Sequence, residues 1–274
     1  MTAVTTTIPA TSPPREAASG LIWLFRDTWT EASRHLRATL RNPDLLVFAT
    51  IQPIMFVVLF VYVFGGAVSV PGYDSYEQFV VPGIFAQTIV FGSVYTALGI
   101  AEDMSKGFID RLRSLPLYQP AVLIGRTFSD LLRNVFTFFV MLIVGFAVGF
   151  RLLGGIPKAI LATLLLLAFA WAFSWIQAYI GLSVNSVEAA NSAGFIWMFP
   201  LTFISSAFVS TETMPDWLAT IANINPFTIV TNATRALYSG NDPGNDVYWS
   251  LLWAAGITIV FSMLSFRKFN SASN

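Results

Sequence analysis

Few side chains in this sequence are of the types that carry out chemistry. There is no cysteine and only one histidine, His35. A single histidine without cysteine or acidic partners makes no zinc site, and thiol catalysis and iron–sulfur clusters are excluded. Neither the G-x-x-x-x-G-K-[ST] loop that cradles nucleotide phosphates nor the G-x-G-x-x-G fingerprint occurs. We therefore expect no catalytic residue, no metal and no cofactor on this chain.

The composition indicates a membrane protein. Hydrophobic residues make up 55% of the chain and charged residues only 11%, against roughly 25% charged residues in soluble domains. A chain this apolar needs the bilayer as its solvent. The net charge of zero argues against nucleic acid as a partner. Residues 1–20 are rich in Thr, Pro and Ala, which predicts a disordered cytoplasmic tail rather than a secretory signal.

Hydrophobic runs predict an all-α integral membrane protein with six transmembrane helices, in a domain covering residues 43–270. About 20 apolar residues cross a bilayer. The six runs are Leu45–Phe64, Val80–Ile100, Leu131–Phe150, Ala159–Val184, Ala193–Phe208 and Val247–Phe266. Pro200 should kink the fifth span. No ionisable residue lies well inside these spans, which argues against an intramembrane proton relay.

The basic residues predict the orientation, because Lys and Arg concentrate in cytoplasmic loops. Twelve fall on one side and three on the other. Both termini are therefore expected in the cytoplasm. The inner set is Arg15, Arg26, Arg34, Arg37, Arg41, Lys106, Arg111, Arg113, Arg126, Arg133, Arg267 and Lys268, and the outer set is Arg151, Lys158 and Arg235.

An amphipathic helix is predicted at residues 21–42. Phe25, Trp29, Ala32, Leu36 and Leu40 share one face, and arginines occupy the other. This pattern is typical of a helix in the headgroup region in contact with membrane lipid. An ordinary amphipathic helix packed on protein has the same pattern.

The segment Glu102–Leu117 predicts a short amphipathic helix on the cytoplasmic side. Met104, Phe108, Leu112 and Leu115 fall near one face, and Pro116 ends the helix. Such a helix can insert its apolar side chains into a groove on a soluble partner. The alternative is a solvated connector whose charges only mark the inner side.

The external stretch Phe208–Leu237 predicts two short helices, Met214–Ala222 and Pro226–Tyr238. Pro215 and Pro226 can each begin a helix. Both helices carry apolar stripes but are too short to span, so we expect them to re-enter the membrane edge and roof a substrate path. Trp217 fits an interfacial anchor, and Arg235 should snorkel outward or cap its helix. The alternative is that the stretch only seals the outer end of the bundle.

Polar residues inside the spans indicate a possible substrate path. Gln52, Gln87 and Gln177 lie at depth, so they favour a helix interface or a wet cleft over lipid. With the aromatic residues Phe56, Phe195 and Phe199, we take Gln52 and Gln87 as candidates. Each aromatic on its own also fits a lipid-facing position.

The motifs Met214-Pro215-x-Trp217-Leu218, Asn225-Pro226-Phe227-Thr228 and Ala233-x-Arg235-Ala236-Leu237 resemble the ABC-2 permeases, closest to the bacterial daunorubicin-resistance type. The resemblance runs from about Arg37 to Phe269. It implies the membrane subunit of an exporter for a hydrophobic or amphipathic solute, such as a drug, an antibiotic, a lipid or a lipid-linked glycan. It also implies a separate ATP-binding-cassette ATPase subunit, which carries ATP and Mg, and a homodimer or a heterodimer with a related permease.

The resemblance also assigns site residues. Glu102, Gly107, Asp110, Arg111 and Leu112 match the segment that docks on the ATPase, and Phe108 lies on its apolar face. Gly125, Arg126 and Asp130 match the start of the next span. Six residues of the external stretch are assigned to a re-entrant gate: Met214, Pro215, Trp217, Asn225, Pro226 and Arg235.

Two other classes were weighed. A secondary transporter needs ion ligands at mid-membrane, often in repeated halves, and the sequence has no internal repeat. A membrane enzyme such as a lipid transferase needs acidic and basic groups together. Asp242 and Asp246 lie with Gly240, Pro243 and Gly244 in a polar turn and face no basic cluster. Copurification with an ATPase would separate the permease from both.

Overall fold

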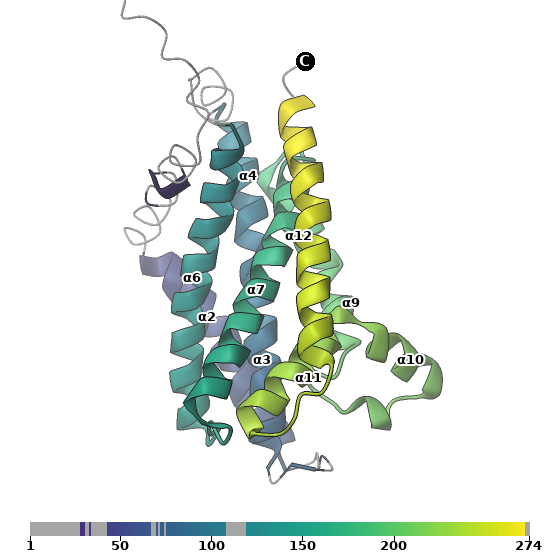
Figure 1. Ribbon diagram of the computed structural model, residues 1–274. Helices are drawn as coiled ribbons and strands as arrows, with labels where there is room; N and C mark the ends of the chain where they lie inside the picture. Colours follow the sequence, from purple (N-terminus) through teal and green to yellow (C-terminus); the bar gives the residue numbers. More distant parts are fainter. Residues whose placement is uncertain are drawn as a thin grey trace, which may run out of the picture.

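The computed structural model describes residues 28–30, 33, 43–66, 70, 72–73, 75–107 and 119–271. Within these ranges every regular element is a helix (Figure 1), which confirms the all-α prediction for this part of the chain. The predicted tail at residues 1–20 lies outside the described residues. So does most of the predicted amphipathic helix at 21–42, of which only 28–30 and 33 are described, as helical.

Within the described ranges, four stretches of helix are long and apolar enough to cross a membrane. They match the predicted second, third, fourth and sixth spans. They are α3 with α4 (Tyr76–Gly92 and Val94–Ser105), α6 (Gln119–Ala147), α7 (Gly155–Gly181) and α12 (Asp246–Ser271). Helix α7 packs against α4, α6, α11 and α12, so it lies at the centre of the bundle, as Figure 1 shows.

The first and fifth predicted spans are interrupted helices. The first consists of α2 (Pro43–Val58) and the π-helix η1 (Leu59–Phe64). The fifth consists of α8 (Val187–Ile196) and α9 (Met198–Phe203). The break at Trp197 follows from Pro200, because proline has no N–H to donate to the carbonyl four residues earlier. Neither is among the four long spans, so a count of six spans remains a prediction.

Helix α6 begins at Gln119, well before the predicted start of the third span at Leu131. Its apolar span, Pro120–Ala147, therefore includes Arg126, Asp130 and Arg133. The absence of ionisable residues at depth remains a prediction for this helix. All three residues lie on the helix, where Asp130 pairs with both arginines.

The two ends of the bundle differ. At one end, the end of α4, the start of α6 and the end of α12 meet in an apolar cluster that includes Ile100, Val122, Leu182 and Phe269. At the other end lie α10 (Asp216–Ile224) and α11 (Pro226–Ser239) (Figure 1). The start of the Glu102–Leu117 segment and the last turns of α12 therefore lie at the same end, as predicted. Which side is cytoplasmic remains a prediction.

Both helices predicted within Phe208–Leu237 lie close to the predicted ranges. Asn225 begins α11, because its Oδ1 accepts from the backbone N–H of Phe227 at 2.8 Å. Gly240 ends it in the left-handed region, with φ of 85°. Helix α11 packs against α3, α7 and α12, whereas α10 packs on α11 and η2 (Thr211–Thr213). Re-entry into the membrane remains a prediction for both.

Candidate functional site

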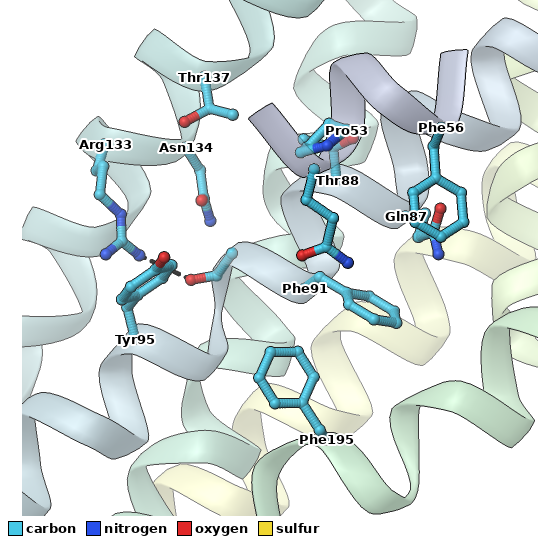
Figure 2. A pocket seen from close by; sticks show the side chains of 12 residues that line it. Pro53, Phe56, Gln87, Thr88, Phe91, Tyr95, Arg133, Asn134, Thr137 and Phe195 are labelled. Carbon is cyan, nitrogen blue, oxygen red and sulfur yellow. Dashed lines mark hydrogen bonds between the residues drawn. The ribbon is translucent and has the colours of Figure 1, made fainter. Parts of the chain in front are cut away.

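A cleft opens between α2, the α3–α4 helix, α6 and α8. Its cavity has a volume of about 70 Å³ and is open on one side. Its lining is Gln52, Pro53, Phe56, Gln87, Thr88, Phe91, Gly92, Tyr95, Arg133, Asn134, Thr137 and Phe195 (Figure 2). Four of the five residues predicted for a substrate path are in this set. The fifth, Phe199, contacts the wall, with its ring centroid 5.3 Å from that of Phe91.

One wall of the cleft is aromatic. The Phe91 ring lies 5.7 Å from Phe195, and Phe199 follows one helical turn later. From Phe199, rings continue away from the cleft through Phe203, Phe208 and Phe60 to Phe56, with centroid separations of 4.5 to 6.2 Å. The aromatic wall therefore runs from the cleft to the turn after α9 and back to the first predicted span.

The other end of the cleft is cationic. The Arg133 guanidinium donates through Nη2 to the carbonyl of Gly92 at 2.7 Å and lies 4.1 Å from the ring centre of Tyr95. Figure 2 shows Arg133 and Tyr95 at one end, with Gln87 and Phe56 at the other. Only 10% of the Arg133 side chain is exposed. Water therefore screens its charge poorly, and its interactions are stronger than at a surface.

Arg133 belongs to a charge cluster on α6, formed with Arg126 and Asp130. Asp130 pairs with both arginines at 3.3 Å and accepts a 2.7 Å hydrogen bond from the Thr96 hydroxyl. Sequence reasoning missed Arg133 as a cleft residue. The signal was present in the spacing, since an acidic residue four residues after one arginine and three before the next shares a helix face with both.

The three glutamines that the sequence placed at depth have different environments. Gln87 is 4% exposed, and among the described residues its Nε2 has no hydrogen-bond partner. Gln52 lines the same cleft but is exposed. Gln177 lies outside the cleft, where its Nε2 donates to the carbonyl of Gly194 at 3.2 Å. Gln177 therefore lies at a helix interface, whereas Gln52 and Gln87 line the cleft.

Arg235 is enclosed by protein, with 2% of its surface exposed. Nε donates to the carbonyl of Phe79 at 2.8 Å, and Nη2 donates to the carbonyls of Ser206 and Ala207 at 2.7 and 3.3 Å. The prediction that Arg235 snorkels outward or caps its helix is wrong. Because helix α11 lies inside the bundle, the Arg235 guanidinium donates hydrogen bonds to carbonyls of α3 and of the turn after α9.

The other residues assigned to the gate are not gathered around one space. Asn225 holds the turn after α9, because its Nδ2 donates to the carbonyls of Leu201 and Ile204 at 2.6 and 2.7 Å. Pro226 is the first residue of α11. Met214 and Pro215 precede α10, and Trp217 on α10 is 68% exposed. The role of these residues as a gate remains a prediction.

The segment assigned to ATPase docking is described only at its start. Glu102 accepts a hydrogen bond from Lys106 at 2.5 Å in the last turn of α4, which raises the pKa of Lys106. Gly107 follows with φ of 63°, in the left-handed region that favours glycine. Phe108, Asp110, Arg111 and Leu112 lie outside the described residues, so their docking role remains a prediction.

The long apolar helices and the cleft among them define a multi-pass membrane protein. Residues 26–238 match the ABC-2 type transporter family, and the chain belongs to this family. It is 35% identical, over 89% of its length and 86% of the relative's, to the daunorubicin resistance ABC transporter permease protein DrrB1 of Streptomyces coeruleorubidus.

A more distant relative is the probable doxorubicin resistance ABC transporter permease protein DrrC of Mycobacterium tuberculosis, 26% identical over 85% of this chain and 84% of the relative. Another is the probable multidrug ABC transporter permease YbhR of Escherichia coli K12. That protein is 28% identical over 65% of this chain and 48% of its own length. The resemblance inferred from the motifs between Met214 and Leu237 is thereby confirmed.

Proposed function

We propose that this chain is the membrane permease of an exporter that moves a hydrophobic or amphipathic solute outward, using ATP hydrolysed by a separate subunit. The observation that carries the proposal is the cleft. Four residues predicted for a substrate path line this cleft, although they come from three separate predicted spans: Gln52, Phe56, Gln87 and Phe195. A wall of rings beside amides and one cation suits a solute with an apolar body and a polar group.

The ATPase is expected on another chain, because the sequence has no phosphate-binding loop. The end of α4 supports a docking place there, since it lies at the same end of the bundle as the C-terminal end of α12 (Figure 1). ATP and Mg would bind the docked subunit. Solute export then requires two states of the permease with different affinities for the ATPase.

A second permease chain, identical or related, is expected beside the cleft. The wall formed by α8 and α9 ends in apolar side chains that are exposed in the single chain, with Ile196 at 75%, Phe203 at 46% and Phe199 at 43%. The cleft is open next to this wall. A single chain therefore does not enclose a solute on all sides. Pairing would complete the enclosure, with lipid covering the remaining apolar faces.

Copurification and transport together test this function. The tagged chain is purified from its host membranes, and the accompanying ATPase is reconstituted with it in inside-out vesicles. We expect ATP-dependent uptake of a neutral fluorescent amphiphile such as 1-pyrenebutanol, strongly reduced in Phe91→Ala and unchanged in Phe139→Ala, a phenylalanine on the exposed face of α6. Absence of a copurifying ATPase, or uptake that ignores ATP, would refute the proposal.

A further inference from the structure

The groups that line the cleft carry unequal charge. Of the described residues in the lining, one is cationic and none is acidic. Asp130, which partly neutralises Arg133, is not in the lining, and it is shared with Arg126. An entering solute therefore meets the positive group directly and meets no carboxylate.

Two hydrogen-bond donors in the lining, Arg133 and Gln87, have capacity to spare. Arg133 makes its one hydrogen bond through Nη2, and among the described residues Nε and Nη1 have no acceptor. The buried Nε2 of Gln87 has none either. By contrast, the Nδ2 of Asn134 donates to the carbonyl of Ile89 at 3.2 Å, and the Thr88 hydroxyl donates to the carbonyl of Ile84 at 2.7 Å. A low-dielectric site with unused donors is best satisfied by an acceptor-rich ligand.

We propose that Arg133 makes the cleft selective for amphiphiles that carry a negatively charged oxygen group, such as a carboxylate or a phosphate. The anion lies against Nε and Nη1 of Arg133, and the apolar body lies along Phe91 and Phe195. The guanidinium is held in place by the Gly92 carbonyl and the face of the Tyr95 ring, so it is ordered before a ligand arrives. This inference rests on the proposed function only in that the cleft holds a solute.

Discrimination should be strong against analogues without the charge. A neutral alcohol of the same shape leaves part of the guanidinium without an acceptor, and a site built to pair a polar group rejects an analogue that lacks the partner. An amine of the same shape adds repulsion between two cations. Hydrogen bonds to charged groups correspond to affinity changes of about tenfold or more.

The test uses three matched probes: 1-pyrenebutyric acid, 1-pyrenebutanol and 1-pyrenebutylamine. Their binding to the purified full-length chain in phosphatidylcholine nanodiscs is measured against empty nanodiscs. We expect the acid to bind about tenfold more tightly than the alcohol and the amine to bind most weakly. Equal affinities of acid and alcohol in the unmodified protein would overturn the proposal, whatever the behaviour of any variant.

Variants locate the selectivity. Arg133→Gln should remove the preference for the acid while leaving alcohol binding within about twofold, and Arg133→Lys should keep part of it. The matched control is Arg151→Gln, which changes an arginine that lies after α6 and outside the cleft lining. A folded Arg133→Gln protein that still prefers the acid would also overturn the proposal.

Two further arms separate the sources of the anion and the two proposals. If phosphatidylglycerol in the nanodisc displaces the acid, the site binds a lipid headgroup. If phosphatidylglycerol does not displace the acid, the site binds a solute acid. Loss of ATP-driven export with the acid preference intact would refute the proposed function alone. Export that treats acid, alcohol and amine alike would refute the charge selectivity alone.

Discussion

Replacing Arg235 should loosen the whole outer end of the bundle. Its guanidinium makes three hydrogen bonds of 2.7 to 3.0 Å, to the carbonyls of Phe79 and Ser206 and to the Asn232 side chain. It also lies 3.7 Å from the centre of the Phe79 ring. Bonds to a charged donor each contribute about 1.5–3 kcal/mol. Removing a buried cation recovers its desolvation, which amounts to several kcal/mol. The net loss for Arg235→Gln is about 3 kcal/mol.

A loss of this size lowers the midpoint of thermal unfolding by about 6–12 °C, measured by tryptophan fluorescence on the purified protein. Arg235→Lys should fall in between, since one ammonium cannot reach acceptors on two elements in the fork geometry of arginine. Arg267→Gln, on the exposed end of α12, is the control and should not move the midpoint. Equal midpoints for Arg235→Gln and Arg267→Gln would refute the assignment of Arg235 as the tie between α3, α11 and the turn after α9.

Three further predictions follow from the same geometry. Gly83→Ala should destabilise the folded protein by about 1–3 kcal/mol, because the added Cβ would lie 2.2 Å from the backbone oxygen of Ala207 in the turn after α9. The control Gly256→Ala, where the added Cβ meets open space, should not change stability. Equal unfolding midpoints for the two variants would contradict this. Gly107→Pro should abolish solute-stimulated ATP hydrolysis without lowering the amount of folded protein, and wild-type hydrolysis would exclude a docking role. Because the chain has no native cysteine, single introduced cysteines can be labelled with a membrane-impermeant reagent. Trp217→Cys should react rapidly, and Thr231→Cys, at a position with 0% exposure, should not. Equal labelling of the two would mean that Phe208–Leu237 is an ordinary exposed loop.

Local pattern was sufficient to predict the helices of the external stretch. Pro215 and Pro226 fix where each helix can begin, and Asn225 between them is both the end of one helix and the cap of the next. These effects act within a few residues, so a single sequence contains them. The cleft was also partly predictable, because amides such as Gln87 inside apolar runs have few places where they avoid lipid.

Contacts between distant segments were not predictable. Arg235 has the flanking pattern of an interfacial arginine, and its acceptors at Phe79 and Ser206 belong to other elements. Arg133 lies near the start of the predicted third span, where its charge serves only to mark the inner side. In the structure its charge is partly offset by Asp130 on the same helix and by the Gly92 carbonyl on α3.

The charge cluster of α6 has a consequence for how the chain enters the bilayer during synthesis. An arginine or aspartate at the centre of a lone inserting helix costs about 2.5–3.5 kcal/mol. The partners that offset this are Thr96 and the carbonyls of Gly92 and Tyr95, all of which precede α6 in the chain. Helix α6 therefore integrates best as a pair with α3–α4. A substitution at Thr96 that removes its hydrogen bond to Asp130 should therefore act during synthesis, by preventing α6 from inserting into the bilayer.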